Sequence, residues 1–278
     1  MVLTLRWWPE RHLKSASRTA RTIVRPQLTE AQWLRMADLF PDKPMTRARR
    51  PLIPPRPCLE GILWRLTSGA DGKIYQGSFR QRPLAGGAFV TGPAAVCQEE
   101  RAWARLLSLD KLRQAGLDPP AGGRLCSRPR RGECGIGRKG KGTTLLLLTD
   151  AHDIPLACHI AAAHESEVNL IKALPDRSVD RPSALSHLLY DKAADSDPLR
   201  GRLQDRFVEL VCPHRDNRTK PPTQDESKLK LYRDRWQIER SISWLHRFRR
   251  LVVRYERHDD LFLGFLQLAC LFTTIQQL

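Results

Sequence analysis

The sequence predicts a mixed α/β fold, in which a sheet flanked by helices follows a small N-terminal helical region. Two apolar runs, 143–150 and 156–163, flank a short turn and predict a β-hairpin. Shorter apolar runs at 184–190 and 207–212 alternate with segments of helical periodicity. Strands that alternate with helices after an initial hairpin are typical of a mixed sheet.

The composition narrows the class of partner. The 278-residue chain carries a formal net charge of +17, an excess that favours a polyanion and above all nucleic acid. A membrane is disfavoured, because the one long apolar run, 261–275, is shorter than a bilayer span and contains Gln267, Thr273 and Thr274. Seven cysteines without a CxxC pair argue against a disulfide framework and a structural zinc site, and favour a reducing compartment, the cytoplasm.

The N-terminal part divides into a basic arm and a helical region. Residues 1–26 are basic and lack the apolar core of a secretory signal, so we expect a disordered arm. Within 27–70, Thr29 and Gln32 occupy the positions of a capping box that starts a first helix, and a second helix starts at Cys58. The pair is either half of a helix-turn-helix DNA reader or a plain helical hairpin. The residues expected to face inward are Trp33, Met36, Leu39, Phe40, Leu59, Ile62, Leu63 and Leu66.

Residues 71–142 follow neither the helical nor the strand period and concentrate glycine, proline and arginine. Only the stretch around 97–116 has a helical pattern. We therefore expect an irregular segment, and place the start of the catalytic domain, 143–278, after it.

Within 143–278, three helices are expected. The first spans 166–177, the second follows a cap formed by Asp195 or Ser196, and the third spans 261–275. A basic loop, 213–230, leads into a segment, 232–251, that reads as one amphipathic helix with a buried apolar stripe. Its opposite face is unusual, because a single carboxylate stands among cations. The side chains expected along this line are Tyr232, Arg235, Glu239 and His246, and the simplest explanation is a solvated face with an Arg235–Glu239 ion pair.

Asp191 is a candidate for chemistry because it comes directly after the apolar run 184–190. Functional residues of α/β sheets collect at the carboxyl ends of parallel strands. Asp191 lies too early to cap the next helix, whereas Asp195 and Asp197 can be explained as helix caps.

The segment YRDRWQIERSISWLHRFRRL resembles the C-terminal signature of DDE transposases of bacterial insertion sequences, Tyr-x2-Arg-x3-Glu followed by a basic or polar residue. The upstream segment LLYDKAADSDPLRGRL resembles the second-aspartate block of that family, and residues 27–70 loosely resemble its N-terminal helices. The resemblance implies a ribonuclease-H-like fold in which two aspartates and a glutamate hold two Mg²⁺ or Mn²⁺ ions. Asp191 and Glu239 match two of these ligands. Tyr232, Arg235 and His246 would support them, and Arg240, Arg247, Arg249 and Arg250 would face DNA.

Such a site has a chemical rationale. Two hard cations polarise the attacking and leaving oxygens of an in-line attack on phosphorus, and Mg²⁺ prefers carboxylate oxygens. We therefore expect Asp191 and Glu239 to lie close enough to share ions. The partners implied are the element's terminal repeats and its target DNA, with no membrane and with a homodimer on DNA as a possible assembly.

The first aspartate of the family motif, Asp-Gly-Ser/Thr-x-Val/Ala-Arg, is missing. Asp118 precedes two prolines, which a central strand does not accommodate, and Asp150 ends the strand 143–150 at the edge opposite the expected site. Both are weak candidates. Alignment back from residue 143 places the aspartate near Gly123, in GRLCS. If those residues were encoded GGA CGG CTC TGT TCG, the second frame reads Asp-Gly-Ser-Val-Arg, so an out-of-frame segment and ordinary divergence both remain open.

Two functions follow. The first is a transposase that cuts and joins DNA with metal ions, inactivated if the first aspartate is lost. The second is a basic nucleic-acid-binding protein without catalysis. Hydrolysis by a serine nucleophile is disfavoured, because the chain contains no GxSxG motif.

Overall fold

The structure is a computed structural model that describes residues 28–37, 40, 54–69, 121–129, 135–137, 140–150, 152–175 and 186–277. The basic arm 1–26 therefore lies outside the described residues, as does the helical pattern around 97–116.

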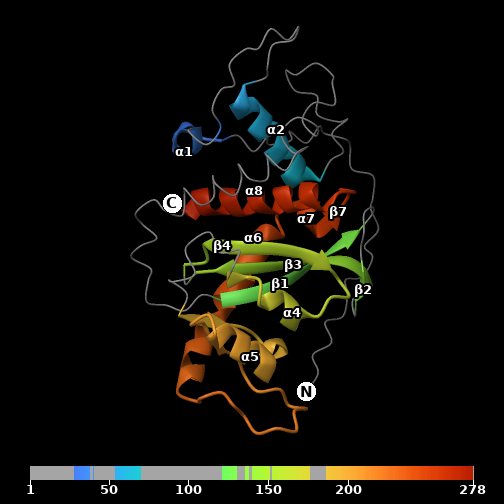
Figure 1. Cartoon of the computed structure of the whole chain (residues 1–278). Helices are drawn as coiled ribbons and strands as arrows, with labels where there is room; N and C mark the ends of the chain where they lie inside the picture. Colours follow the sequence, from blue (N-terminus) through green and yellow to red (C-terminus); the bar gives the residue numbers. More distant parts are fainter. Residues whose placement is uncertain are drawn as a thin grey trace, which may run out of the picture.

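A mixed sheet forms the centre of the molecule (Figure 1). Its strands follow the order β4-β3-β1-β5-β6, with β3 antiparallel to both of its neighbours and β1, β5 and β6 parallel to one another. This arrangement is the ribonuclease-H-like mixed sheet, so the expected fold class is confirmed. Two short strands extend it, since β2 pairs with β3 and β7 pairs with β1. The bounds are β1 Ala121–Pro129, β2 Gly135–Gly137, β3 Gly140–Thr149, β4 Pro155–Ala162, β5 His187–Leu189, β6 Glu209–Val211 and β7 Val253–Arg254.

Helices cover both faces of the sheet, and each face has its own apolar cluster. The first cluster joins one face of β1 and β3 to α6 (Trp236–Leu245), α8 (Asp259–Gln277) and α2 (Pro55–Ser68). The second cluster joins the other face to α4 (Glu167–Ile171) and α5 (Asp197–Gln204). Both clusters draw on β3, whose run Leu145–Leu148 is buried throughout, as expected of a strand covered on both faces.

The N-terminal helices agree with the sequence pattern. Thr29 and Gln32 form the predicted capping box of α1 (Glu30–Met36), each side chain accepting a backbone N–H from the other residue. Helix α2 begins at Pro55, three residues earlier than expected, and ends at Gly69, whose φ of 69° suits a residue without a side chain. The four expected apolar residues of α2 are buried, Leu59, Ile62, Leu63 and Leu66. Leu39 lies outside the described residues.

The expectation that 71–142 is irregular is wrong for its last part. The sheet includes β1, β2 and the start of β3, so within the described residues it begins at residue 121 rather than 143. The glycines and the proline of β1 hid the strand pattern in the sequence, because these residues are unfavourable in strands. The extended conformation of β1 depends instead on its pairing with β3 and β5. Residues 70–120 lie outside the described part of the chain.

The segment 232–251 is not one helix. A 3₁₀ segment, η6 (Lys228–Arg235), leads into α6, which ends at Leu245, and a separate turn, α7 (Arg249–Val252), follows. Phe248 causes the break. It adopts an extended backbone with ψ of 92°, is buried, and packs edge-on against Phe272 of α8 with ring centroids 6.5 Å apart. A contact across the fold thus overrides the local helical period.

Strands β5 and β6 lie within the expected runs 184–190 and 207–212, whereas helix α4 ends at Ile171, short of the expected 177. Strands β3 and β4 pair as the expected antiparallel hairpin. Ser196 occupies the N-cap position of α5 without a capping hydrogen bond from its side chain, and Pro198 lies in the first turn. Helix α8 is the expected buried C-terminal helix. No helix in the described ranges is long and apolar enough to cross a membrane.

Candidate active site

The parallel pair β1 and β5 sets the position of Asp191. Ala121 pairs with Leu189, the last residue of β5, and continuing this parallel register by two residues would set Asp191 beside Gly123. Successive residues of an extended chain point to opposite faces. Leu189 belongs to the apolar cluster under α6 and Tyr190 to the opposite cluster. Asp191 therefore points to the α6 face of the sheet.

The turn after β5 holds Asp191 in place. Its carboxylate accepts the backbone N–H of Ala193 at 2.8 Å and caps a short 3₁₀ turn, η5 (Lys192–Ala194). The expectation that Asp191 lies too early to cap a helix is therefore wrong for this turn. Arg215 donates to the carbonyl oxygens of Lys192, at 2.9 Å, and of Ala193, so the basic loop clamps this turn from outside.

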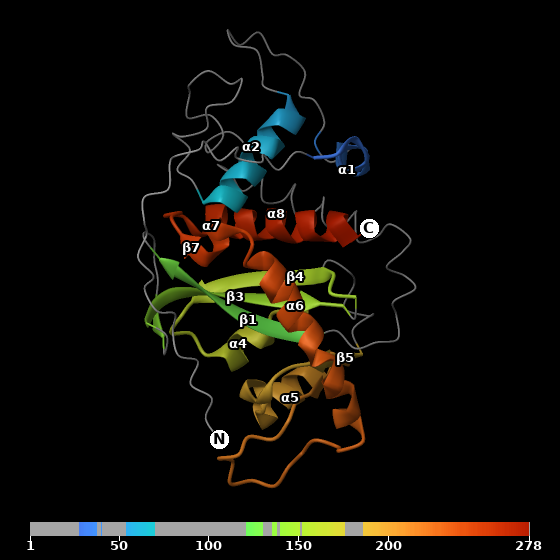
Figure 2. The same ribbon diagram turned by 180° about the vertical axis from the view of Figure 1, so that it is seen from behind.

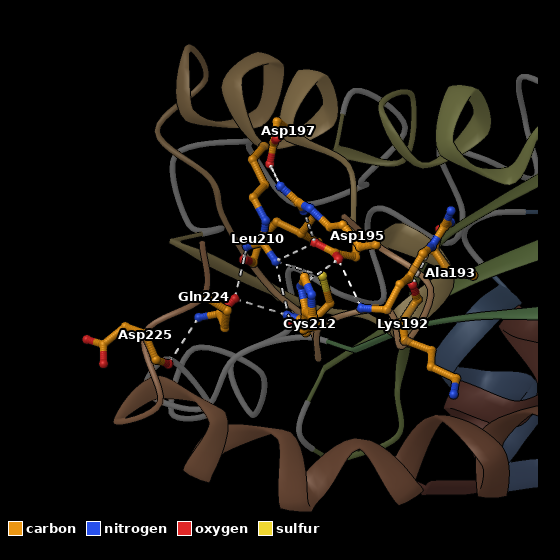
Figure 3. Close-up of polar contacts among 12 residues, drawn as sticks. Lys192, Ala193, Asp195, Asp197, Leu210, Cys212, Gln224 and Asp225 are labelled. Atoms are coloured by element: carbon orange, nitrogen blue, oxygen red, sulfur yellow. Dashed lines mark hydrogen bonds and ion pairs between the residues drawn. The ribbon is translucent and has the colours of Figure 1, made fainter. Parts of the chain in front are cut away.

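Asp195 anchors that loop, as Figure 3 shows. Its carboxylate, only 1% exposed, accepts hydrogen bonds from Arg218 at 2.7 Å, from Arg200 at 3.5 Å and from the backbone N–H of Arg215 at 3.0 Å. Asp195 is therefore not the helix cap that the sequence suggested, because three arginines use its oxygens and Ser196 occupies the N-cap position. Burial raises the pKa of the neighbouring Cys212 thiol to about 11, so that thiol is protonated and unreactive at neutral pH.

This clamp was missed at the level of sequence. The sequence did contain a signal for it. Arg215 and Arg218 lie three residues apart in the loop 213–230, which follows the largely buried strand β6. Arg215 and Arg218 of this basic loop bind the chain itself.

Glu239 lies in the first turn of α6, which begins beside β5 (Figure 2). Its side chain is 65% exposed and accepts from Arg235 at 2.8 Å, so the predicted ion pair is confirmed. The guanidinium of Arg235 lies 5.4 Å from the ring centroid of Tyr232. The segment η6, which leads into α6, contacts β5, the strand that precedes the turn of Asp191. That the carboxylates of Asp191 and Glu239 lie close enough to share ions stays a prediction.

His246 does not join this group. It caps the C-terminal end of α6 and is exposed, about 10 Å along the helix axis from Glu239 at 1.5 Å per residue. The structure therefore brings together Tyr232, Arg235 and Glu239 of the expected line.

The four arginines assigned to DNA fall into different environments. Arg247 and Arg249 are exposed. Arg240 is 44% exposed, pairs with the buried Asp153, and lies over the rings of Trp236 and Trp244. Arg250 is a correction: it is 2% exposed, donates to Glu256 at 2.7 Å and stacks on Tyr255 at 4.3 Å, so it stabilises the fold and cannot face DNA.

Asp150, one of the two weak candidates for the first aspartate, is used in a turn. Asp150 accepts the backbone N–H groups of His152, at 2.9 Å, and Ile154, at 2.8 Å, and thereby closes the β3–β4 turn. Burial raises the pKa of Asp150. Asp118 lies outside the described residues.

The residue at the level of Asp191 in β1 is a glycine. Gly123 pairs with Leu147 of β3 and faces Ile238 of α6. The donors in this region are thus the carboxylates of Asp191 and Glu239, and within the described residues no three or more His, Cys, Asp and Glu side chains form a group that could hold a metal ion. Two carboxylates, one of them paired with Arg235, do not fit the two-ion site that the resemblance implies.

The chain is similar to several known proteins. The putative transposase of insertion sequence element IS402 from Burkholderia cepacia is 35% identical over 150 residues, which cover 51% of this chain and 67% of that protein. The putative transposase of element IS6501 from Brucella ovis is 29% identical over 129 residues, 46% of this chain and 94% of that protein. The catalytic domain of Mos1 mariner transposase aligns with 58% of this chain and 93% of that domain, at 13% identity and a TM-score of 0.25.

The family described as the transposase DDE domain matches residues 124–273. The match covers more than half of the chain, begins in β1 and extends into α8, so it includes Asp191, Glu239 and every principal strand of the sheet. The chain belongs to the transposase DDE domain family.

Proposed function

We propose that this transposase-family chain binds DNA and, in its present form, does not cut or join it. The observation that carries the proposal is Gly123, at the level of Asp191 on the central strand, where a third carboxylate would be needed. Losing one of three ligands removes the fixed geometry of the two ions, on which most of the rate of such reactions depends.

The DNA-binding part of the proposal rests on charge. The net charge of +17 is far above what solubility needs, and Arg247, Arg249 and Arg233 are exposed on or beside the helix that carries Glu239. The aromatic ring of Trp236, 54% exposed, lies on the same helix. Cations beside an exposed aromatic ring suit a nucleic-acid surface.

The residues that remain still have roles that do not require an ion. Arg235 holds Glu239, and the Asp195 clamp holds the turn of Asp191, so both carboxylates keep a defined position. We propose that Asp191 and Glu239 are the surviving ligands of the family's metal site and that Tyr232 and Arg235 position Glu239.

The test uses the full chain, labelled duplexes that carry the element's ends, and Mg²⁺ or Mn²⁺. We expect a rise in fluorescence anisotropy on binding and no cleavage product on a sequencing gel. Cleavage by the unaltered chain that is lost in Asp191→Asn would overturn the inactive assignment, and absence of binding at low salt would overturn DNA as the partner.

A further inference from the structure

Strand β1 and helix α6 approach each other so closely at Gly123 that no side chain fits between them. A carbon placed at the Cβ position of Gly123 would lie 2.6 Å from Cγ1 of Ile238 and 2.9 Å from Cδ1 of Ile242. Carbon atoms pack at about 3.5–4.0 Å, so any side chain at position 123 overlaps both isoleucines.

The isoleucines have little room to withdraw. Ile238 is fully buried, and it packs in the cluster that joins the sheet to α6 and α8. Ile242 is partly buried against the same cluster. Interiors are close-packed, so moving Ile238 away from Gly123 forces changes in its other neighbours.

The opposite face of β1 offers no alternative. A Cβ at Gly122 would lie 2.6 Å from Cδ2 and Cε2 of Tyr190. That ring is held in turn, because the Tyr190 hydroxyl donates to Glu167 at 2.8 Å, and Glu167 pairs with Arg124 of β1. Both glycines are therefore covered by fixed side chains, and position 123 alone has the level and the face of Asp191.

We propose that Ile238 and Ile242 occupy the place of the missing carboxylate, so that Gly123→Asp alone does not create a divalent-cation site, whereas Gly123→Asp combined with Ile238→Ala does. Helix α6 packs directly on β1 at this position, so both the glycine of β1 and the isoleucines of α6 prevent a carboxylate from occupying it. The inference rests on the proposed function only for the positions of Asp191 and Glu239.

The first experiment tests the packing without a charge. Gly123→Ala should lower the thermal midpoint of unfolding, because the added methyl group overlaps Ile238. The matched control is Gly201→Ala in α5, where a Cβ meets nothing within 4 Å and the loss of glycine in a helix should raise the midpoint. A midpoint for Gly123→Ala equal to or above that of the unaltered chain would overturn the occlusion.

The second experiment measures Mn²⁺ binding by electron paramagnetic resonance of the free ion, together with the thermal midpoint with and without Mn²⁺. The unaltered chain, Gly123→Asp and Ile238→Ala should each show no saturable site at sub-millimolar Mn²⁺. The double variant should bind and should be stabilised by Mn²⁺, since a ligand that binds only the folded state raises its stability. Adding Glu239→Gln to the double variant should abolish the site.

Two results would contradict the inference. Gly123→Asp alone could bind Mn²⁺ as tightly as the double variant, in which case the isoleucines do not block the position. The folded double variant could fail to bind, in which case position 123 does not reach Asp191 and Glu239. DNA anisotropy of the unaltered chain tests the proposed function separately, because it requires neither Mn²⁺ nor a substitution.

Discussion

At the scale of single residues, similar side chains have opposite roles, and burial distinguishes them. Arg247 and Arg250 lie three residues apart in a segment that reads as uniformly basic. Arg247 is exposed, whereas Arg250 is buried against Glu256 and Tyr255. The sequence could not separate them, because the break at Phe248 rotates the chain between them.

We therefore predict that Arg250→Ala lowers the free energy of unfolding by about 3–5 kcal/mol, the usual cost of leaving one member of a buried ion pair alone. Arg247→Ala should leave stability nearly unchanged and reduce the magnitude of the salt slope of DNA binding by about one. Urea denaturation and anisotropy titrations over a range of salt concentrations measure the two effects. A normal stability for Arg250→Ala would mean that its pairing with Glu256 is not formed in solution.

Asp150 gives a second prediction, which concerns pH. Burial raises its pKa above the ordinary value of 3.8, so the folded state binds its proton more tightly than the unfolded state. The favourable contribution is complete below pH 3.8 and is lost as pH rises through the folded pKa. Asp150→Asn keeps an oxygen acceptor for His152 and Ile154 but cannot ionise.

The stability of Asp150→Asn relative to the unaltered chain should therefore increase from pH 3.8 upward and level off above the folded pKa. Unfolding by urea at several pH values gives this difference directly. The measurements should run from about pH 3 to about pH 7, which spans the ordinary aspartate pKa of about 3.9. A stability difference between the two proteins that stays constant over this range would show that the pKa of Asp150 is not raised.

At the scale of elements, the sequence predicted the features that depend on residues close together in the chain. The capping box of α1, the β3–β4 hairpin and the proline near the start of α5 depend on neighbouring residues, and each was predicted. Strand β1 and the break after α6 depend on partners far along the chain, and both were missed. Asp191 was found because it follows a strand directly, whereas the Asp195 clamp needs a loop 20 residues later.

The break gives a testable consequence. Phe248→Ala should lower the free energy of unfolding by about 3–5 kcal/mol, because it leaves a cavity beside Phe272 and removes the contact that turns the chain. Phe207→Ala is the control, since Phe207 is 91% exposed and its ring contributes little burial. Urea denaturation of both variants measures their free energies of unfolding. Equal losses of stability would argue against Phe248 as the residue that causes the break.

At the scale of the whole molecule, the positive charge is only partly available to a ligand. Several arginines and lysines of the described part are neutralised internally, among them Arg200, Arg218 and Lys228. The number of cations that bind phosphates is therefore smaller than composition suggests. The sequence could give the sign of the charge but not this division.

Binding to duplex DNA should nevertheless weaken steeply with salt, with a log–log slope of about −0.9 for each phosphate neutralised. Lys228→Ala, which removes a lysine held by Glu209 at 2.6 Å, should leave that slope unchanged, in contrast to Arg247→Ala. Anisotropy titrations of the two variants in parallel make the comparison. Equal losses of slope would show that the internal pairs open when DNA binds.

The position of β1 has a consequence for synthesis. This central strand pairs with β3, which follows it closely, but also with β5 and with β7 at Val253–Arg254. On the ribosome, the end of this second edge that pairs with β7 stays unpaired until more than a hundred further residues have been made. Premature termination before β7 would leave that edge and the apolar face under α8 open to other chains. A shortened product of this gene should therefore be cleared or aggregate rather than accumulate as a competitor for DNA.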